Sequence, residues 1–301
     1  MPGGENSNLS LAAGRSRPRE LSSKLAMARS AQAFVSREQL LAALLIVTSA
    51  NGIVPLAIAA ARQAGFWNGF TNTFGISAIV WAAWIAGCTI VLQGDGTTPP
   101  RRSDFVVTAL AAPFVFAPVL SLSWPCLTAI AAYVFFTTDR DSALRRAAPI
   151  FAAIAVPMCW GPLLLRFAAY PILDIDAILV GTITGAPHSG NVIQYTDSRL
   201  VLQIFDGCSS FHNISQALVA WIATNRVLGQ SWHWKDTAGC ALAVAAAIAV
   251  NLGRLSFMAL RPANYELLHG PLGDRIAGTL TLVLIILVCA VGHRRELFAR
   301  A

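Results

Sequence analysis

Charged side chains are scarce in this sequence, where Asp, Glu, Lys and Arg make up only 12% of the residues. A soluble domain carries roughly 25% charged residues. Hydrophobic residues make up 55% of the chain, so most of its surface cannot face water. This composition excludes an ordinary soluble enzyme and favours a helical protein embedded in a lipid bilayer.

Motifs for metal or nucleotide binding are also missing. The six cysteines contain no Cys-x-x-Cys pair, and no Cys/His cluster has metal-site spacing, so no metal is expected. There is no glycine-rich phosphate loop and no internal repeat. The net charge of +7 would suit nucleic acid, but most basic residues flank apolar runs. At such positions they set membrane orientation and contact lipid headgroups, so lipid rather than nucleic acid is the expected partner.

Seven apolar runs are candidates for membrane spans, and a helix needs about 20 residues to cross the hydrocarbon. The run at 105–138 would measure about 51 Å as one helix, against about 30 Å for the hydrocarbon. Ser121, Ser123 and Pro125 lie near its middle, so it predicts two short helices joined by a tight turn. The runs are 40–61, 73–92, 105–138, 147–165, 208–225, 237–253 and 276–292.

The predicted fold is therefore an all-α polytopic membrane protein with about eight transmembrane helices. With both termini in the cytoplasm, sixteen of the 22 Lys and Arg residues face inward, as the positive-inside rule requires. Residues 1–38 form a basic cytoplasmic tail, partly disordered or an interfacial helix. Residues 39–293 form the membrane domain and 294–301 a cytoplasmic C-terminal tail. The longest external segment covers residues 169–207.

A small β-hairpin is expected at the end of this external segment. Two short β-prone runs, 192–195 and 200–205, flank Thr196-Asp197-Ser198, which is typical of a turn. The second run leads directly into Asp206-Gly207-Cys208-Ser209-Ser210. The hairpin therefore delivers a cysteine to the outer face of the membrane.

Cys208 differs from the other five cysteines, which lie inside apolar runs. In the first turn of a helix its thiolate would be favoured by the helix dipole and free backbone N–H groups. Gly207 would let a substrate backbone approach, Ser209 or Ser210 could cap the helix, and Asp206 would support the same turn. The alternative is a buried structural cysteine.

Three polar residues further along the chain fall on the same side of the membrane. Asn251 and Arg254 lie at the outer end of the seventh expected span, and His269 lies in the loop before the last one. Together they would supply an anion stabiliser and a general acid/base for the thiol. Arg254 could instead contact lipid headgroups. His212 is a rival base, because it lies four residues after Cys208 and shares a helix face with it.

This order of motifs resembles the exosortase/archaeosortase family of membrane cysteine proteases and transpeptidases. The resemblance covers roughly residues 180–273 and the eight-helix layout. The family has a small residue, Cys, Ser and Gly, then Asn-x-x-Arg, then a His about fifteen residues later; here these match Gly207-Cys208-Ser209-Ser210, Asn251-x-x-Arg254 and His269. The departures are Gly207 for the family's usual Ala and Ser210 for its Gly.

The resemblance implies a peptidase or transpeptidase at the periplasmic face of the inner membrane, with Cys208, Arg254 and His269 as its catalytic residues. Its substrate would be an exported protein with a C-terminal sorting signal, made of a short motif, a transmembrane helix and a basic tail. A link to exopolysaccharide production and the absence of a cofactor are also implied. The rival interpretations are a polysaccharide polymerase, flippase or transporter for lipid-linked sugars, and a membrane scaffold.

Overall fold

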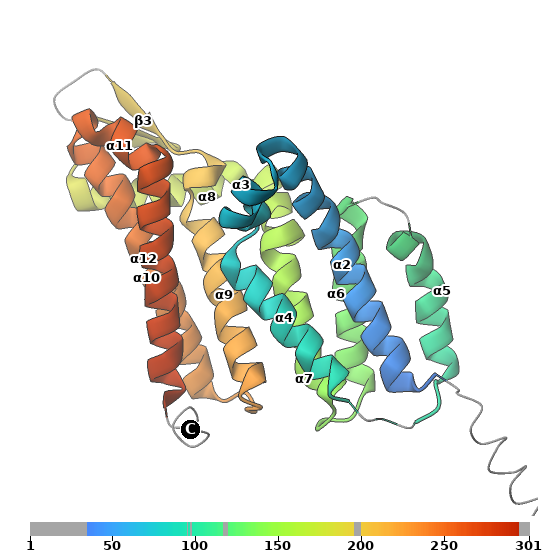
Figure 1. The fold of residues 1–301 in the computed structure, drawn as a ribbon. Helices are drawn as coiled ribbons and strands as arrows, with labels where there is room; N and C mark the ends of the chain where they lie inside the picture. The colour runs from blue at the N-terminus through green and yellow to red at the C-terminus, as the bar shows by residue number, and fades with distance from the viewer. Residues whose placement is uncertain (1–34, 95, 97, 117–119, 196–199, 295–301) are drawn as a thin grey trace, which may run out of the picture.

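The computed structural model describes residues 35–94, 96, 98–116, 120–195 and 200–294. Nearly all of the tail 1–38, most of the tail 294–301 and the turn at Thr196-Asp197-Ser198 lie outside the described residues. The described chain is mostly helical, with helices standing side by side and a small sheet at one end (Figure 1).

The first half of the chain forms helices whose ends are set by local capping. Ser36 accepts a hydrogen bond from the Gln39 amide while the Gln39 side chain accepts one from the Ser36 amide, and this capping box starts the first long helix. The elements are α2 (Arg37–Ala64), α3 (Phe66–Thr71), the 3-10 turn η1 (Thr73–Gly75), α4 (Ala78–Leu92), α5 (Arg102–Phe116), α6 (Leu120–Thr137) and α7 (Ala143–Ala155).

The second half contains the sheet and the residues that the sequence singles out. The elements are the π-helical turn η2 (Val156–Trp160), α8 (Gly161–Thr184), β1 (His188–Ser189), β2 (Val192–Gln194), β3 (Val201–Gln203), the 3-10 turn η3 (Asp206–Cys208), α9 (Ser210–Val227), α10 (Trp234–Leu260), η4 (Pro262–Asn264), α11 (Tyr265–His269) and α12 (Pro271–Gly292).

Four of the described helices are long and apolar enough to cross a membrane: Arg37–Ala64, Ala143–Thr184, Trp234–Leu260 and Pro271–Gly292. Shorter apolar helices cover Ala78–Leu92 and Leu122–Thr137. The run at 105–138 forms two helices, α5 and α6, as expected, but the turn expected near Ser121, Ser123 and Pro125 is wrong, because these residues lie in the first turns of α6. The chain is thus a helical protein with several potential membrane spans.

The external segment differs from the expectation, because much of it is helical. The expected span at 147–165 continues through η2 into α8, which ends only at Thr184. The backbone leaves helical geometry at Ala168, where φ is −128° and ψ is 27°. Pro171 follows this break, and a proline cannot donate the backbone hydrogen bond of a continuous helix. Beyond the break, α8 turns across the end of the bundle beneath the sheet (Figure 1).

The predicted hairpin is present and has one additional strand. Strands β2 and β3 pair antiparallel with Ile193 opposite Leu202, and both side chains are buried. The third strand, β1, pairs antiparallel with β2. It was not expected, because two residues are too few to show an alternating pattern.

Two clusters of buried apolar side chains hold the molecule together. The larger lies among the helices of the bundle. The smaller joins α8, the sheet and the outer part of α10, and it includes Ile204, Cys208, Leu255 and Met258. The Cys208 side chain is therefore packed in an apolar core at the sheet end of the bundle.

Candidate active site

The turn that carries Cys208 links the sheet to α9. The Cys208 amide donates a hydrogen bond to the Phe205 carbonyl at 2.8 Å, which closes the 3-10 turn η3. Ser209 is the N-cap of α9, and its hydroxyl accepts a hydrogen bond from the Phe211 amide at 3.2 Å. The expectation that Cys208 occupies the first turn of the helix is wrong, since α9 begins at Ser210.

His269 lies beside the thiol, although 61 residues separate the two in the chain. The Cys208 Sγ atom is 3.7 Å from His269 Nδ1, which is within hydrogen-bond range for sulfur. His269 is the last residue of α11, and its ring stacks on Tyr265 with centroids 5.0 Å apart and planes 14° apart. The stacked tyrosine fixes the orientation of the imidazole towards the sulfur.

Arg254 contacts the segment that carries His269. Its Nε and Nη2 atoms donate hydrogen bonds to the Leu268 carbonyl oxygen at 3.0 and 2.8 Å. It also forms an ion pair with Asp274 on α12. The guanidinium is largely buried, whereas the Asp274 carboxylate is exposed. Arg254 therefore joins α10, α11 and α12 next to the imidazole.

Asn251 lies one turn before Arg254 on α10 and binds the cysteine turn instead. Its Nδ2 atom donates hydrogen bonds to the Cys208 carbonyl at 2.7 Å and to Ser210 Oγ at 3.1 Å. The side chain is buried, and both hydrogen bonds are shielded from water. The Asn-x-x-Arg spacing thus places two contacts on one face of α10, one to the turn of Cys208 and one to the segment of His269.

Asp176 completes the surroundings of the turn and was missed as a site residue. Its Oδ2 atom accepts hydrogen bonds from Ser209 Oγ at 3.0 Å and from the Ser210 amide at 2.9 Å. From the sequence alone, Asp176 has no role beyond its position in the expected external segment 169–207. An acid inside the otherwise apolar stretch after Tyr170 was the available signal, because such a group needs a specific partner.

The surroundings of the Cys208 thiol favour its protonated form. Burial raises the pKa of Cys208 above that of an ordinary cysteine. The charge of Arg254 lowers this pKa, but Asp274 raises it again. The expectation that the helix terminus favours the thiolate is therefore not met. Ionisation of Cys208 requires a base, and His269 Nδ1 is in position to be one.

A polar hollow of about 240 Å³ opens beside the cysteine turn. It lies between α9, α10 and α12, and its lining includes Gly207, Ser209, Asn251, Arg254 and Asp274. The Cys208 side chain does not line the hollow and is 9% exposed. Gly207 and Ser209, its two neighbours in the chain, face the hollow instead.

The rival base His212 also lines the hollow but has a different partner. Its Nε2 atom is 2.7 Å from the side-chain nitrogen of Gln216, one turn later on α9. Asp206 is exposed, and its backbone carbonyl accepts a hydrogen bond from the Ser209 amide at 3.2 Å. The structure thus brings Cys208, His269, Arg254 and Asn251 together, with His212 across the hollow.

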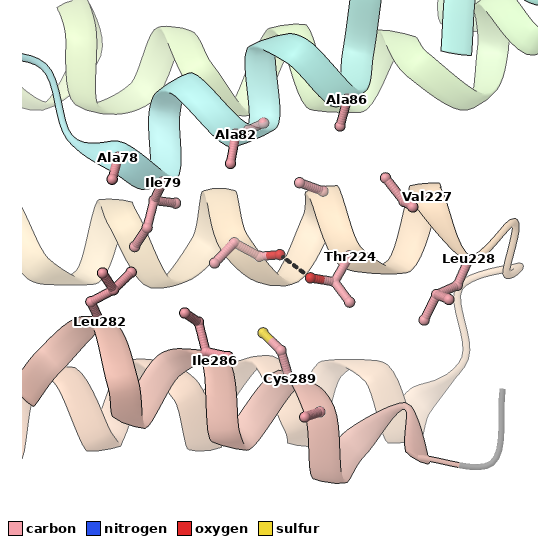
Figure 2. A pocket seen from close by; sticks show the side chains of 14 residues that line it. Ala78, Ile79, Ala82, Ala86, Thr224, Val227, Leu228, Leu282, Ile286 and Cys289 are labelled. Atoms are coloured by element: carbon pink, nitrogen blue, oxygen red, sulfur yellow. Dashed lines mark hydrogen bonds between the residues drawn. The ribbon is translucent and has the colours of Figure 1, made fainter. Parts of the chain in front are cut away.

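A separate apolar groove of about 540 Å³ lies between α4, α9 and α12. Figure 2 shows Ala78, Ala82 and Ala86 of α4 along one side of this groove. Thr224 is its hydroxyl-bearing residue, and that hydroxyl donates to the Ala220 carbonyl at 2.8 Å. The α4 side of the groove therefore offers mainly small side chains to an occupant, whereas α12 contributes the larger Leu282 and Ile286.

No group of three or more His, Cys, Asp or Glu side chains that could hold a metal ion occurs within the described ranges. No protein-family model, curated protein or solved structure matches this chain.

Proposed function

We propose that this chain is an exosortase-like peptidase or transpeptidase of the inner membrane. It would cleave the C-terminal sorting signal of exported proteins through a thioester on Cys208. The observation that carries the proposal is the 3.7 Å approach of Cys208 Sγ to His269 Nδ1, beside the guanidinium of Arg254. A nucleophile within reach of an oriented base is the geometry that covalent catalysis requires.

The proposed topology has eight spans and both termini in the cytoplasm. The spans are α2, α4, α5, α6, α7 with the start of α8, α9, α10 and α12. The basic loops around Arg101, Arg145 and Lys235 lie at the end of the bundle opposite the sheet (Figure 1). Because cytoplasmic loops are enriched in Lys and Arg, this distribution supports a periplasmic position for Cys208.

The proposed reaction begins when His269 Nδ1 accepts the thiol proton. The thiolate attacks the scissile carbonyl carbon and forms a C–S bond, which moves negative charge onto the carbonyl oxygen. When the C–N bond breaks, the imidazolium returns the proton to the departing amine. Water or an acceptor amine then attacks the thioester, and release of the acyl group restores the Cys208 thiol.

Arg254 has two roles in this proposal. It holds the Leu268 carbonyl, and through it the imidazole, and its positive charge also acts on Cys208, where a substrate carbonyl would be attacked. A guanidinium in a partly buried site stabilises an oxyanion more strongly than it would in water. The apolar groove between α4, α9 and α12 would accommodate the transmembrane helix of the substrate, since the small side chains of Ala78, Ala82 and Ala86 permit close helix packing.

A trapping experiment tests the proposal. The chain is expressed with a tagged exported protein that carries a terminal motif, a transmembrane helix and a basic cluster. We expect trimming by the unchanged chain and by Cys88→Ala, whose cysteine lies in α4, and none by Cys208→Ala. A hydroxylamine-sensitive adduct at Cys208 would identify the thioester. Full trimming by Cys208→Ala would reject the peptidase and favour the polysaccharide polymerase, flippase or transporter.

A further inference from the structure

Asp176 is a buried acid with no part in the proposed covalent chemistry. Its side chain is on the part of α8 that crosses the end of the bundle, and the residue is only 4% exposed. A buried carboxylate is costly unless hydrogen bonds replace the water that it loses. The Ser209 hydroxyl and the Ser210 amide supply those bonds at 3.0 and 2.9 Å.

Both partners of Asp176 directly follow Cys208 in the chain. The carboxylate therefore fixes the C-terminal side of the cysteine turn to α8. On the opposite side, Asn251 fixes the Cys208 carbonyl to α10 through a 2.7 Å hydrogen bond. The backbone at Cys208 is thus held between two helices, and the direction of its side chain follows from these contacts.

The same carboxylate also binds a backbone N–H group at the N-terminus of α9 that could otherwise bind another anion. A free N–H group at a helix N-terminus would stabilise a nearby thiolate. Here the Ser210 N–H is already donated to Asp176. Within the described part of the chain, the base in contact with the Cys208 sulfur is His269. Reactivity of the thiol therefore depends on how well the turn aims it at that imidazole.

We infer that Asp176 is a positioning residue, which orients Cys208 towards His269 by holding Ser209 and Ser210. This inference rests on the proposed function, in which Cys208 is the nucleophile. Asp176 does not touch the reacting atoms. Its effect on reactivity is expected to pass through His269.

Alkylation of Cys208 by iodoacetamide tests this role without a substrate. The full chain is labelled in detergent micelles across acidic to alkaline pH, and modification of the Cys208 peptide is followed by mass spectrometry. At neutral pH we expect the rate to fall about tenfold or more in Asp176→Asn, because a neutral amide accepts the Ser209 and Ser210 hydrogen bonds more weakly than a carboxylate and leaves the thiol less well aligned with its base. His269→Ala should show a similar fall in rate. In both variants the rise of the alkylation rate with pH should move to more alkaline pH.

The double variant separates positioning from a general loss of structure. If Asp176 acts through His269, then Asp176→Asn combined with His269→Ala should react no more slowly than His269→Ala alone. A further fall would show an independent structural role and overturn the inference. So would a faster reaction of Asp176→Asn, which would mean that the carboxylate only restricts access to the thiol.

The matched control is Asp174→Asn, which makes the same chemical change two residues earlier on α8. Asp174 is half-buried, and no contact with the cysteine turn is expected to change. Its alkylation rate should stay within about twofold of the unchanged chain. Trimming of the tagged protein is measured in parallel. If the effect of Asp176→Asn on alkylation depends on His269 but the unchanged chain does not trim the tagged protein, the proposed function is rejected and the positioning role stands. If Asp176→Asn trims the tagged protein as the unchanged chain does, the positioning role alone is rejected.

Discussion

The Arg254 guanidinium donates two hydrogen bonds to the carbonyl oxygen of Leu268, the residue that precedes His269. Both donors belong to the planar group of one side chain, so the contact fixes direction as well as distance. The arginine therefore helps to set the place of the imidazole, in addition to the charge that it brings to the site.

The first prediction concerns this forked contact. Arg254→Lys keeps the positive charge but replaces the planar donors with a single ammonium group. We expect trimming of the tagged protein to fall at least about tenfold, because a misplaced base lowers the rate steeply. The control is Arg275→Lys, an exposed position on α12, which should trim normally. Normal trimming by Arg254→Lys would show that charge alone matters.

His269, beside the Cys208 thiol, and His212, at the hollow, are expected to behave differently. His269→Ala should lower trimming about 10²-fold or more, the range for loss of a general base. His212→Ala should change it by no more than a few-fold, because its ring is paired with Gln216. Initial rates of trimming decide between them. The reverse order would make His212 the base and remove His269 from the mechanism.

Loss of the Asn251 amide should destabilise the fold. Asn251→Ala leaves the buried Cys208 carbonyl without its side-chain donor, which costs about 1–3 kcal/mol. Thermal unfolding in detergent measures the change. Asn68→Ala removes an exposed amide contact to Ala64 and should have little effect. Equal stability of the two variants would mean that the Asn251 contact contributes nothing.

The pH dependence of Cys208 follows from its raised pKa. The ordinary value is about 8.5, so the folded chain retains the thiol proton at alkaline pH where an unfolded chain loses it. Stability should therefore decline as pH rises above about 8.5, up to the folded pKa. In His269→Ala, the alkylation rate should still be rising beyond pH 8.5 or so. A midpoint at or below that value would contradict the effect of burial.

Filling the apolar groove between α4, α9 and α12 should impair substrate binding without altering the reactivity of the Cys208 thiol. Ala82→Leu adds bulk where a transmembrane helix would pack, so KM for the tagged protein should rise about tenfold, in line with the 1–3 kcal/mol cost of overpacking. Cys208 alkylation should be unchanged. Ala245→Leu adds the same bulk to an exposed position of α10 and serves as the control. Unchanged KM in Ala82→Leu would place the substrate helix elsewhere.

Local signals were sufficient to predict much of the fold. The apolar runs correspond to helices, and the length of 105–138 correctly indicated two of them, although Ser121 to Pro125 lie inside α6. The β-prone runs at 192–195 and 200–205 correspond to β2 and β3. In each case the residues that determine the helix or strand are neighbours in the chain, so the pattern can be recognised from this sequence alone.

Other features depend on distant partners or on single-residue boundaries. The end of α8 was missed because Arg166, Asp174 and Asp176 interrupt its apolar pattern. The contact from Asp176 to Ser209 spans 33 residues, and no motif in either segment specifies it. The helix start at Ser210 lies two residues after Cys208, and burial by residues distant in the chain raises the pKa of the thiol.

The separation of Cys208 and His269 in the chain also has a consequence for biosynthesis. Ribosomes add roughly 5–20 residues per second, so the 61 residues between the two take about 3–12 s to synthesise. During that interval the nascent chain carries the cysteine without its imidazole. Nucleophile and base can meet only after α10 and α11 have been made, so the thiol stays without its base while both helices are synthesised.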